Sequence, residues 1–284
     1  MMRTDKRRPL RWIIPLLLIL AVGWLWFYWQ CWGLQTTCTT VPVHDLPVGF
    51  MGCRIVHISD LHGHEYGEGS ERLLARVREA EPELIFLTGD LIDRESHLAM
   101  IPALAKGLAS IAPTYYVTGN HEWDVGNVPT LKNLLTQCGV TVLSNEYEVL
   151  ERWGDRMILA GVDDPNGYAD QKTPEELYEE ISAQVPGETV LLLAHRNDRF
   201  DQYAHAGYDL VFSGHAHGGI VRLPFTDGLL GTNRKFFPTR TSGVYTVGES
   251  TLFVSRGLGN NTSPISGFRL FNRPEVAVVE LAGK

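Results

Sequence analysis

At 284 residues, of which 44% are hydrophobic and 20% charged, the chain has the composition of one large globular domain with a short appendage. Its formal net charge of −8 argues against a nucleic-acid-binding surface, which would need a basic stripe. Four cysteines are too few for a disulfide scaffold, and their spacings match no zinc-ligand pattern. We therefore expect no nucleic-acid partner, and no feature of the sequence predicts a protein partner.

The N-terminal appendage contains an uncharged apolar stretch, residues 12–29, which falls within the roughly 17–25 residues that a membrane-spanning helix needs. One acid, Asp5, precedes it together with five basic residues: Arg3, Lys6, Arg7, Arg8 and Arg11. Under the positive-inside rule we expect residues 1–32 to form a cytoplasmic stub and a single-pass signal anchor in the cell membrane, with the large domain extracytoplasmic. The alternative is a cleaved secretory signal, but no small-x-small cleavage site follows the apolar stretch.

After an expected linker at residues 33–53, strands alternate with helical stretches up to about residue 219. Apolar periodicity and capping residues predict helices over residues 71–81, 96–110, 128–138 and 174–184, and residues 139–162 favour a hairpin. Beyond residue 219, glycine- and proline-rich loops separate short strands at 244–247 and 251–255, and a last strand covers 275–281. This order predicts an α/β fold with a largely parallel sheet in the first half and more extended structure in the second.

Five short apolar runs each end on residues able to bind a metal. The runs are residues 54–59, 84–88, 115–118, 189–194 and 210–213, and their lack of polar alternation predicts strands buried on both faces. The residues at their ends are Asp60, His62, Asp90, Asp93, Asn120, His121, His195, His215 and His217. Ligands of α/β sheets gather beyond the carboxyl ends of the strands. The sequence therefore predicts one metal site where several strand ends converge.

The spacing of these residues indicates two ions rather than one. Asp60 and His62 lie two residues apart at the end of a strand, so both side chains can bind the same metal ion. The carboxylate of Asp90 has two oxygens, which is enough to bridge two metal ions. Two metals roughly 3.5–4 Å apart are the arrangement that clamps an in-line phosphoryl displacement. A mixture of carboxylate, amide and imidazole ligands suits manganese, iron or zinc better than magnesium or calcium.

These motifs, in this order, resemble the calcineurin-like metallophosphoesterase family. The matching segments are Asp60-x-His62, Gly89-Asp90-x-x-Asp93, Gly119-Asn120-His121-Glu122, His195 and Gly214-His215-x-His217. Further segments at 213–219, 222–224, 254–259 and 272–275 look like the membrane-associated bacterial phosphodiesterases of the YaeI/YkuE type. The resemblance implies that residues 54–284 form one phosphoesterase domain, an α/β/β/α sandwich of two mixed sheets flanked by helices.

The resemblance also implies a role for each motif residue. One metal would be held by Asp60, His62, Asp90 and His217, and the second by Asp90, Asn120, His195 and His215. His121 would lie over the phosphate and protonate the leaving oxygen, and Asp93 would hold the other nitrogen of that imidazole. The nucleophile would be a metal-bridging hydroxide.

Two further residues are candidates for substrate contact. Arg256 would grip a phosphate with two hydrogen bonds, although a structural ion pair is an equal reading of this arginine. His64 follows Asp60 and His62 closely enough to touch substrate. In addition, Ala216 and Ile220 stand where the YaeI/YkuE-type proteins have Thr and Gln, which leaves every expected ligand in place but bears on the substrate.

The sequence thus predicts a membrane-anchored dinuclear-metal phosphoesterase that hydrolyses phosphodiester or pyrophosphate bonds. Its substrate would be an envelope lipid, a wall polymer or a nucleotide-linked molecule near the membrane. Three alternatives remain: a UDP-linked acyl-sugar pyrophosphatase of the lipid A type, a phosphomonoesterase or protein phosphatase, and a non-catalytic binding module. The last is disfavoured because no expected ligand is missing.

Overall fold

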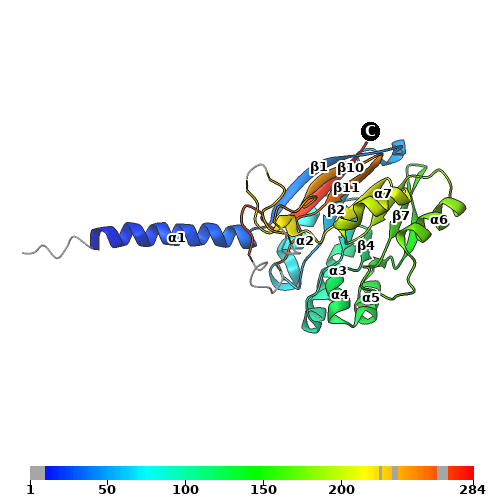
Figure 1. The fold of residues 1–284 in the computed structure, drawn as a ribbon. Helices are drawn as coiled ribbons and strands as arrows, with labels where there is room; N and C mark the ends of the chain where they lie inside the picture. The colour runs from blue at the N-terminus through cyan, green and yellow to red at the C-terminus, as the bar shows by residue number, and fades with distance from the viewer. Residues whose placement is uncertain (1–9, 224–225, 232–235, 261–267) are drawn as a thin grey trace, which may run out of the picture.

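The computed structural model describes residues 10–223, 226–231, 236–260 and 268–284. Within them, two six-stranded mixed sheets pack face to face, and helices cover their outer faces (Figure 1). The basic residues Arg3, Lys6, Arg7 and Arg8, on which the expected membrane orientation depends, lie outside this part of the chain.

The first sheet carries three of the five motif-bearing strands. Its order is β1 (Gln35–Val43), β12 (Glu275–Gly283), β2 (Arg54–Ile58), β3 (Leu84–Thr88), β4 (Thr114–Val117) and β5 (Thr141–Val142). All neighbours run parallel except β12 and β2. Three helices pack their apolar faces on its outer side: α2 (Glu71–Glu79), α3 (Ile101–Ala109) and α5 (Val128–Gln137).

The second sheet carries the other two motif-bearing strands, β8 and β9. Its order is β10 (Gly243–Val247), β11 (Ser250–Val254), β9 (Leu210–Ser213), β8 (Val190–Leu193), β7 (Asp155–Gly161) and β6 (Glu146–Arg152). The central pairs are parallel, and the pairs β10–β11 and β7–β6 are antiparallel hairpins. Its outer face is covered by α6 (Pro174–Gln184) and α7 (Phe200–Ala206).

Between the sheets lies an apolar core of side chains from the facing strands, among them Ile55, Phe86, Val117, Leu191, Phe212 and Phe253. The strands that supply it are continuously apolar because each packs on the other sheet with one face and on helices with the other. The predicted α/β/β/α sandwich is therefore confirmed.

Two local expectations differ from the structure. The helix expected over residues 96–110 begins as a 3₁₀ helix, Glu95–Met100, and becomes α3 only at Ile101. The expected linker at 33–53 contains β1, which pairs in parallel with β12 along its whole length. Its four threonines and alternating exposure are typical of an edge strand with one face in the core.

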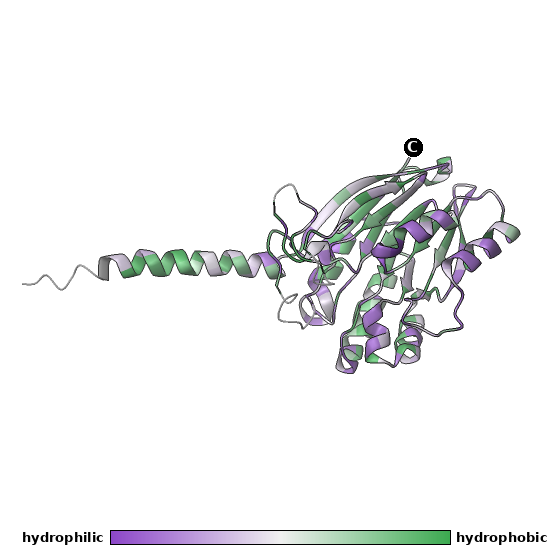
Figure 2. Ribbon diagram, viewed as in Figure 1, coloured by the Kyte–Doolittle hydropathy of each residue, from purple (hydrophilic) through white to green (hydrophobic). Residues whose placement is uncertain are grey.

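Helix α1 (Leu10–Trp32) projects away from the sandwich, and Figure 2 shows it hydrophobic over most of its length. Residues Trp12–Trp32 of this helix are long and apolar enough to cross a membrane, and the most apolar part is wholly outside the protein core. By length and composition, α1 is the candidate membrane span that the sequence predicts.

Candidate dinuclear metal centre

The strand ends converge as expected, and they bring the predicted ligands into two overlapping groups. The first is Asp60, His62, Asp90 and His217, and the second is Asp90, His195 and His215; within each group the candidate ligand atoms lie within 4.8 Å of one another. Asp90 belongs to both groups, which is the position a bridging carboxylate requires. Asn120 adds an amide oxygen from the first residue of α4 (Asn120–Val125).

The backbone at the strand exits is bent sharply to aim these side chains. Five of the candidate ligands adopt positive φ angles of 48° to 66°: Asp60, His62, Asp90, His215 and His217. Such left-handed residues cost about 1–3 kcal/mol each and are concentrated at functional sites. Gly89 and Gly119 let two of the exit loops touch, since a Cβ built on Gly89 would lie 2.2 Å from the Gly119 nitrogen.

The imidazole hydrogen bonds leave lone pairs directed at the centre. His195 Nδ1 lies 2.6 Å from the Thr88 carbonyl oxygen, which can only accept, so we assign its proton to Nδ1 and a lone pair to Nε2. By the same reasoning His62 donates from Nδ1 to Asp93, at 2.5 Å. His62 Nε2 then lies 2.9 Å from His217 Nε2. Without a metal, His217 Nε2 donates a hydrogen bond to His62 Nε2, and both nitrogens belong to the group that could hold one cation.

Two orphaned atoms give a second test of whether this centre fits metal ions. The His195 Nε2 and Asn120 Oδ1 atoms are buried and have no hydrogen-bond partner among the described residues. Leaving such a group unpaired costs about 1–3 kcal/mol, which a coordinated cation would remove. His195 Nε2 lies 3.1 Å from Asp90 Oδ2. The donor set is carboxylate, amide and imidazole, so these residues fit the two divalent metals that the sequence predicts.

Electrostatics tie the buried carboxylates to the imidazoles. Burial alone would raise the pKa of Asp90, but His195 and His62 outweigh it and hold that pKa well below its usual value. Burial alone would lower the pKa of His195, and in the metal-free cluster the Asp90 carboxylate instead raises it to about 10. A second proton on Nε2 then faces Asp90, and a bound cation would replace that proton and leave the Nε2 lone pair as a ligand. Burial beside His62 holds the pKa of His217 well below its usual value, so the ring is neutral and able to bind a metal. The ionised Asp90 carboxylate thus attracts positive charge at the point that the two ligand groups share.

Asp93 and His121 form a third group with His62 at the edge of this cluster, and its candidate ligand atoms also lie within 4.8 Å of one another. Asp93 Oδ1 lies 2.9 Å from His121 Nδ1. The same oxygen also accepts from His62, which was not foreseen, so one carboxylate orients both imidazoles. Burial would lower the pKa of His121, but Asp93 and Asp90 raise it to about 9. In the metal-free protein these carboxylates favour the protonated form of His121, whose side chain is 29% exposed.

Glu122 is a positioning residue that the sequence reasoning quoted in a motif but gave no role. Its buried carboxylate accepts from four backbone N–H groups: Gly119 at 2.7 Å, Asp90 at 2.9 Å, Leu91 at 2.6 Å and Ile92 at 3.3 Å. It thereby joins the loops that carry Asp90 and Asn120. The available signal was its place three residues after Gly119, where a helix N-terminal Glu reaches back to the capping residue.

The two candidate substrate-contacting residues lie outside the ligand groups. Arg256 is held by Glu275, with Nη2 3.0 Å from Oε1 and a backbone hydrogen bond of 2.8 Å. The His64 ring contacts the Trp32 ring at the end of α1 at a tilt of 35° and the Tyr66 ring edge-on at 86°. Both therefore have structural partners, and their contact with substrate stays a prediction.

Arg196 is a second residue that the sequence reasoning missed. Its guanidinium pairs with Asp164 through contacts of 2.7 and 3.2 Å, and its Nη1 lies 3.3 Å from His215 Nε2. These partners are 32 and 19 residues away in the sequence, and no local pattern relates them. Arg196 therefore brings a fixed positive charge to the edge of the candidate centre.

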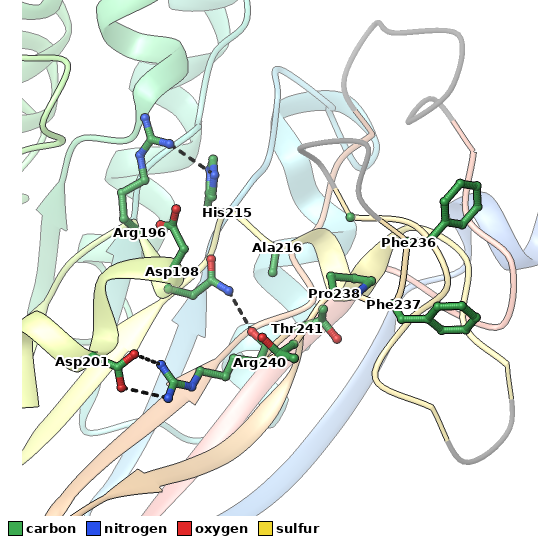
Figure 3. Close-up of a pocket in the computed structure, with 13 residues that line it drawn as sticks. Arg196, Asp198, Asp201, His215, Ala216, Phe236, Phe237, Pro238, Arg240 and Thr241 are labelled. Carbon is green, nitrogen blue, oxygen red and sulfur yellow. Dashed lines mark hydrogen bonds and ion pairs between the residues drawn. The ribbon is translucent and has the colours of Figure 1, made fainter.

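A cavity of about 740 Å³ opens next to His215 (Figure 3). Arg196 and His215 lie at one end, and Phe236 and Phe237 lie toward the other. Arg240 crosses its wall and forms a two-pronged ion pair with Asp201, at 2.9 and 3.0 Å. The cavity is large enough for the organic part of a phosphate ester, since small-molecule sites measure about 300–1,000 Å³.

Comparison with known proteins agrees with this geometry. The model of the family described as "Calcineurin-like phosphoesterase" matches residues 53–219. The chain is 31% identical to the uncharacterized metallophosphoesterase YkuE of Bacillus subtilis over 87% of this chain and 85% of that protein. It is 31% identical to phosphodiesterase YaeI of Escherichia coli over 80% and 82%.

Some similar proteins contain additional sequence. A Danio rerio protein named "Transmembrane protein with metallophosphoesterase domain" is 30% identical over 85% of this chain, which spans 56% of that protein's length. The matched family is dinuclear-metal dependent, and its range includes all seven candidate ligands.

Proposed function

The chain belongs to the calcineurin-like phosphoesterase family and is a metal-dependent phosphoester hydrolase, and we propose that it hydrolyses phosphodiester or pyrophosphate bonds at a membrane surface. The observation that carries the proposal is the position of Asp90, which belongs to both ligand groups beside an open cavity. A single carboxylate shared between two groups is the feature that a two-metal phosphoryl site needs.

Each ligand group would hold one divalent cation. Asp60, His62, Asp90 and His217 would hold the first, and Asp90, Asn120, His195 and His215 the second. Manganese, iron and zinc suit these donors. When bound, the pair supplies Lewis-acid stabilisation of the phosphoryl oxygens and a nucleophile from water at neutral pH.

The remaining chemistry falls to the residues beside the ligands. His121 would donate a proton to the leaving oxygen, and its protonated form is favoured by the nearby Asp93 carboxylate. Asp93 would fix the orientation of that ring through the 2.9 Å contact with Nδ1. Arg196 would add positive charge where the phosphoryl group develops negative charge, a kind of electrostatic stabilisation that is often the largest catalytic effect.

The cavity favours a diester over a monoester. A diester or pyrophosphate carries an organic group on each side of the reacting phosphorus, and the cavity beside His215 gives one of these groups a place to bind. Helix α1 would tether the site to a membrane, which raises the concentration of lipid-linked substrates around it. Substrates are therefore expected among envelope lipids, wall polymers and nucleotide-linked lipid precursors.

The proposal is tested by comparing substrates on metal-free protein reloaded with manganese, iron or zinc. We expect metal-dependent hydrolysis of bis-p-nitrophenyl phosphate, with a higher kcat/KM than for p-nitrophenyl phosphate. Preference for the monoester would favour the phosphomonoesterase alternative, and cleavage of a UDP-linked acyl sugar above both would favour the pyrophosphatase. If no ester is hydrolysed with two metals bound, the hydrolase proposal is wrong.

A further inference from the structure

Helix α1 is docked firmly on the sandwich instead of being joined by a flexible tether. Only Gly33 and Leu34 separate it from β1. The Arg273 guanidinium stacks over the Trp29 ring at 3.9 Å and donates hydrogen bonds to the carbonyl oxygens of Gly33, at 3.1 Å, and Leu34, at 2.8 Å. These contacts fix the direction of the helix relative to the sheets, so a membrane crossed by α1 would have a fixed position relative to the cavity.

A loop of the domain lies beside the last turns of the apolar helix. The Phe271 ring lies 5.4 Å from the Trp26 ring, and the Phe268 ring lies 6.4 Å from that of Phe27. Trp26 and Phe27 precede the helix end at Trp32 by five to six residues, or about 8–9 Å along the axis. A bilayer spanned by α1 therefore reaches the level of this loop.

The same loop is hydrogen-bonded to the segment that borders the cavity. Val221 forms a parallel bridge with Leu270. The Leu229 nitrogen bonds to the Val221 oxygen at 2.7 Å, and the Phe237 nitrogen to the Leu229 oxygen at 3.1 Å. This path connects the loop beside α1 to the wall of the cavity.

Several large apolar side chains along this path are exposed to solvent. Phe236 is 69% exposed, Phe237 66%, Phe271 50% and Leu223 42%. We call these four residues the apolar rim. Phe236 and Phe237 border the cavity beside His215 (Figure 3), and Phe271 contacts Trp26 of α1, so the rim extends from the cavity to α1. Exposed apolar groups gathered next to a ligand cavity mark an interaction surface.

We propose that the apolar rim enters the interface of the membrane spanned by α1, so that the cavity receives a lipid-linked phosphoester directly from the bilayer. This inference rests on the proposed function and names the substrate class of that site. The rim is continuous with α1 through the contact between Phe271 and Trp26, and the apolar residues of α1 are exposed. A bilayer that covers the apolar residues of α1 would also cover the rim, so we assign the rim to the bilayer. Amphipathic surfaces of this kind bury their apolar groups about 5–10 Å into the headgroup boundary.

The depth of the rim can be measured on the full chain in nanodiscs of phosphatidylcholine and phosphatidylglycerol. Nitroxide labels are attached to cysteines introduced one at a time at Phe236, Phe237 or Phe271. The background is Cys38→Ser with Cys138→Ser, because Cys38 is exposed and Cys138 partly exposed, whereas Cys31 and Cys53 are buried. We expect oxygen to relax these labels more than a water-soluble nickel reagent does. A label at Trp153, 80% exposed on the β6–β7 turn, is the control and should show the reverse. Aqueous accessibility at all three rim positions would overturn the inference.

Hydrolysis gives an independent measurement, with two substrates that share one leaving group but are presented in solution or in a membrane. The substrates are bis-p-nitrophenyl phosphate in solution and a phosphatidyl p-nitrophenyl diester in the nanodisc. Phe236→Ser combined with Phe237→Ser should lower the ratio of kcat/KM on the lipid diester to that on the soluble diester by roughly tenfold or more, since burial of one Phe is worth about that factor. Trp153→Ser should leave the ratio unchanged, and an unchanged ratio in the rim variant would contradict the inference.

The two proposals fail in distinguishable ways. If the loaded wild type cleaves the soluble diester and ignores the lipid diester, the bilayer inference is wrong and the proposed hydrolase stands. If it cleaves neither while the labels report bilayer depth, the rim is a membrane surface and the proposed reaction is wrong. Dimerisation in detergent that disappears with the rim variant, together with aqueous labels in nanodiscs, would assign the rim to a second copy of the chain.

Discussion

At the scale of single residues, His121 separates metal binding from catalysis. Its ring is held by Asp93 and lies outside the two proposed ligand sets, so His121→Ala should keep both metals and lose roughly 10²–10⁴-fold in kcat, the range for a positioned acid. The loss should shrink for phenyl diesters with better leaving groups, which need less protonation. The measurement is kcat across such a series, with His205→Ala on the exposed side of α7 as control. An equal loss for every leaving group would remove the proton-donor role.

Glu122 should control the position of the ligand loops without touching a metal. Glu122→Gln leaves one acceptor oxygen for four N–H groups, so at least one buried donor loses its partner, and the free energy of unfolding should fall by about 1–3 kcal/mol. Urea denaturation and metal affinity are the measurements.

The matched control for Glu122 is Glu176→Gln. Glu176 holds the same third position of a helix in α6, where it accepts from the Thr173 nitrogen at 2.8 Å, but it is exposed. Glu176→Gln should lower the free energy of unfolding by a few tenths of a kcal/mol at most, as for surface substitutions in general. Equal losses in the two variants would show that Glu122 is an ordinary capping residue.

Residues that the sequence predicted well are those whose position follows from strand direction. Asp60, Asp90 and His195 each follow a continuously apolar strand, and parallel strands in packed sheets deliver such residues to one edge. Arg196 could not be placed in the same way, because its partner Asp164 comes from a different loop. The contacts of Asp93 with both His121 and His62 likewise depend on the tertiary structure, and the spacing of these residues in the sequence does not predict them.

At the scale of secondary structure, the segment between α1 and β2 was the main surprise. Its threonines and valines favour a strand, yet the partner of β1 is β12, some 240 residues away, so the pairing has no local signal. The two ends of the chain are therefore joined in one sheet, and Val41 and Val43 are fully buried.

Two truncations should separate the anchor from the domain. Deleting residues through Trp32 removes α1 but keeps β1, and we expect a folded enzyme that binds two metals without detergent. Deleting residues through Cys53 also removes β1 and its buried valines, so this form should fail to fold. Circular dichroism and metal content distinguish the two. Folding of the shorter form would restore the interpretation of residues 33–53 as a linker.

At the scale of the whole molecule, orientation decides which lipids the site can reach. The basic residues before the apolar stretch favour a cytoplasmic N-terminus, and the C-terminus lies at the end of the sandwich away from α1 (Figure 1). An alkaline phosphatase fused after Lys284 should therefore be active, and a green fluorescent protein fused there should be dark. The opposite pair of results would place the domain inside and favour UDP-linked precursors as substrates.

The shared carboxylate is the centre of this account, and metal counting tests it most directly. Elemental analysis of the reloaded full chain should find two divalent metals per chain in the wild type. His215→Ala should keep the first metal and lose much of the second, because His215 belongs to one ligand group only. Asp90→Asn should lose most of both together with diester hydrolysis, because a neutral amide cannot bridge two dications. Two tightly bound metals in Asp90→Asn would contradict the bridging role.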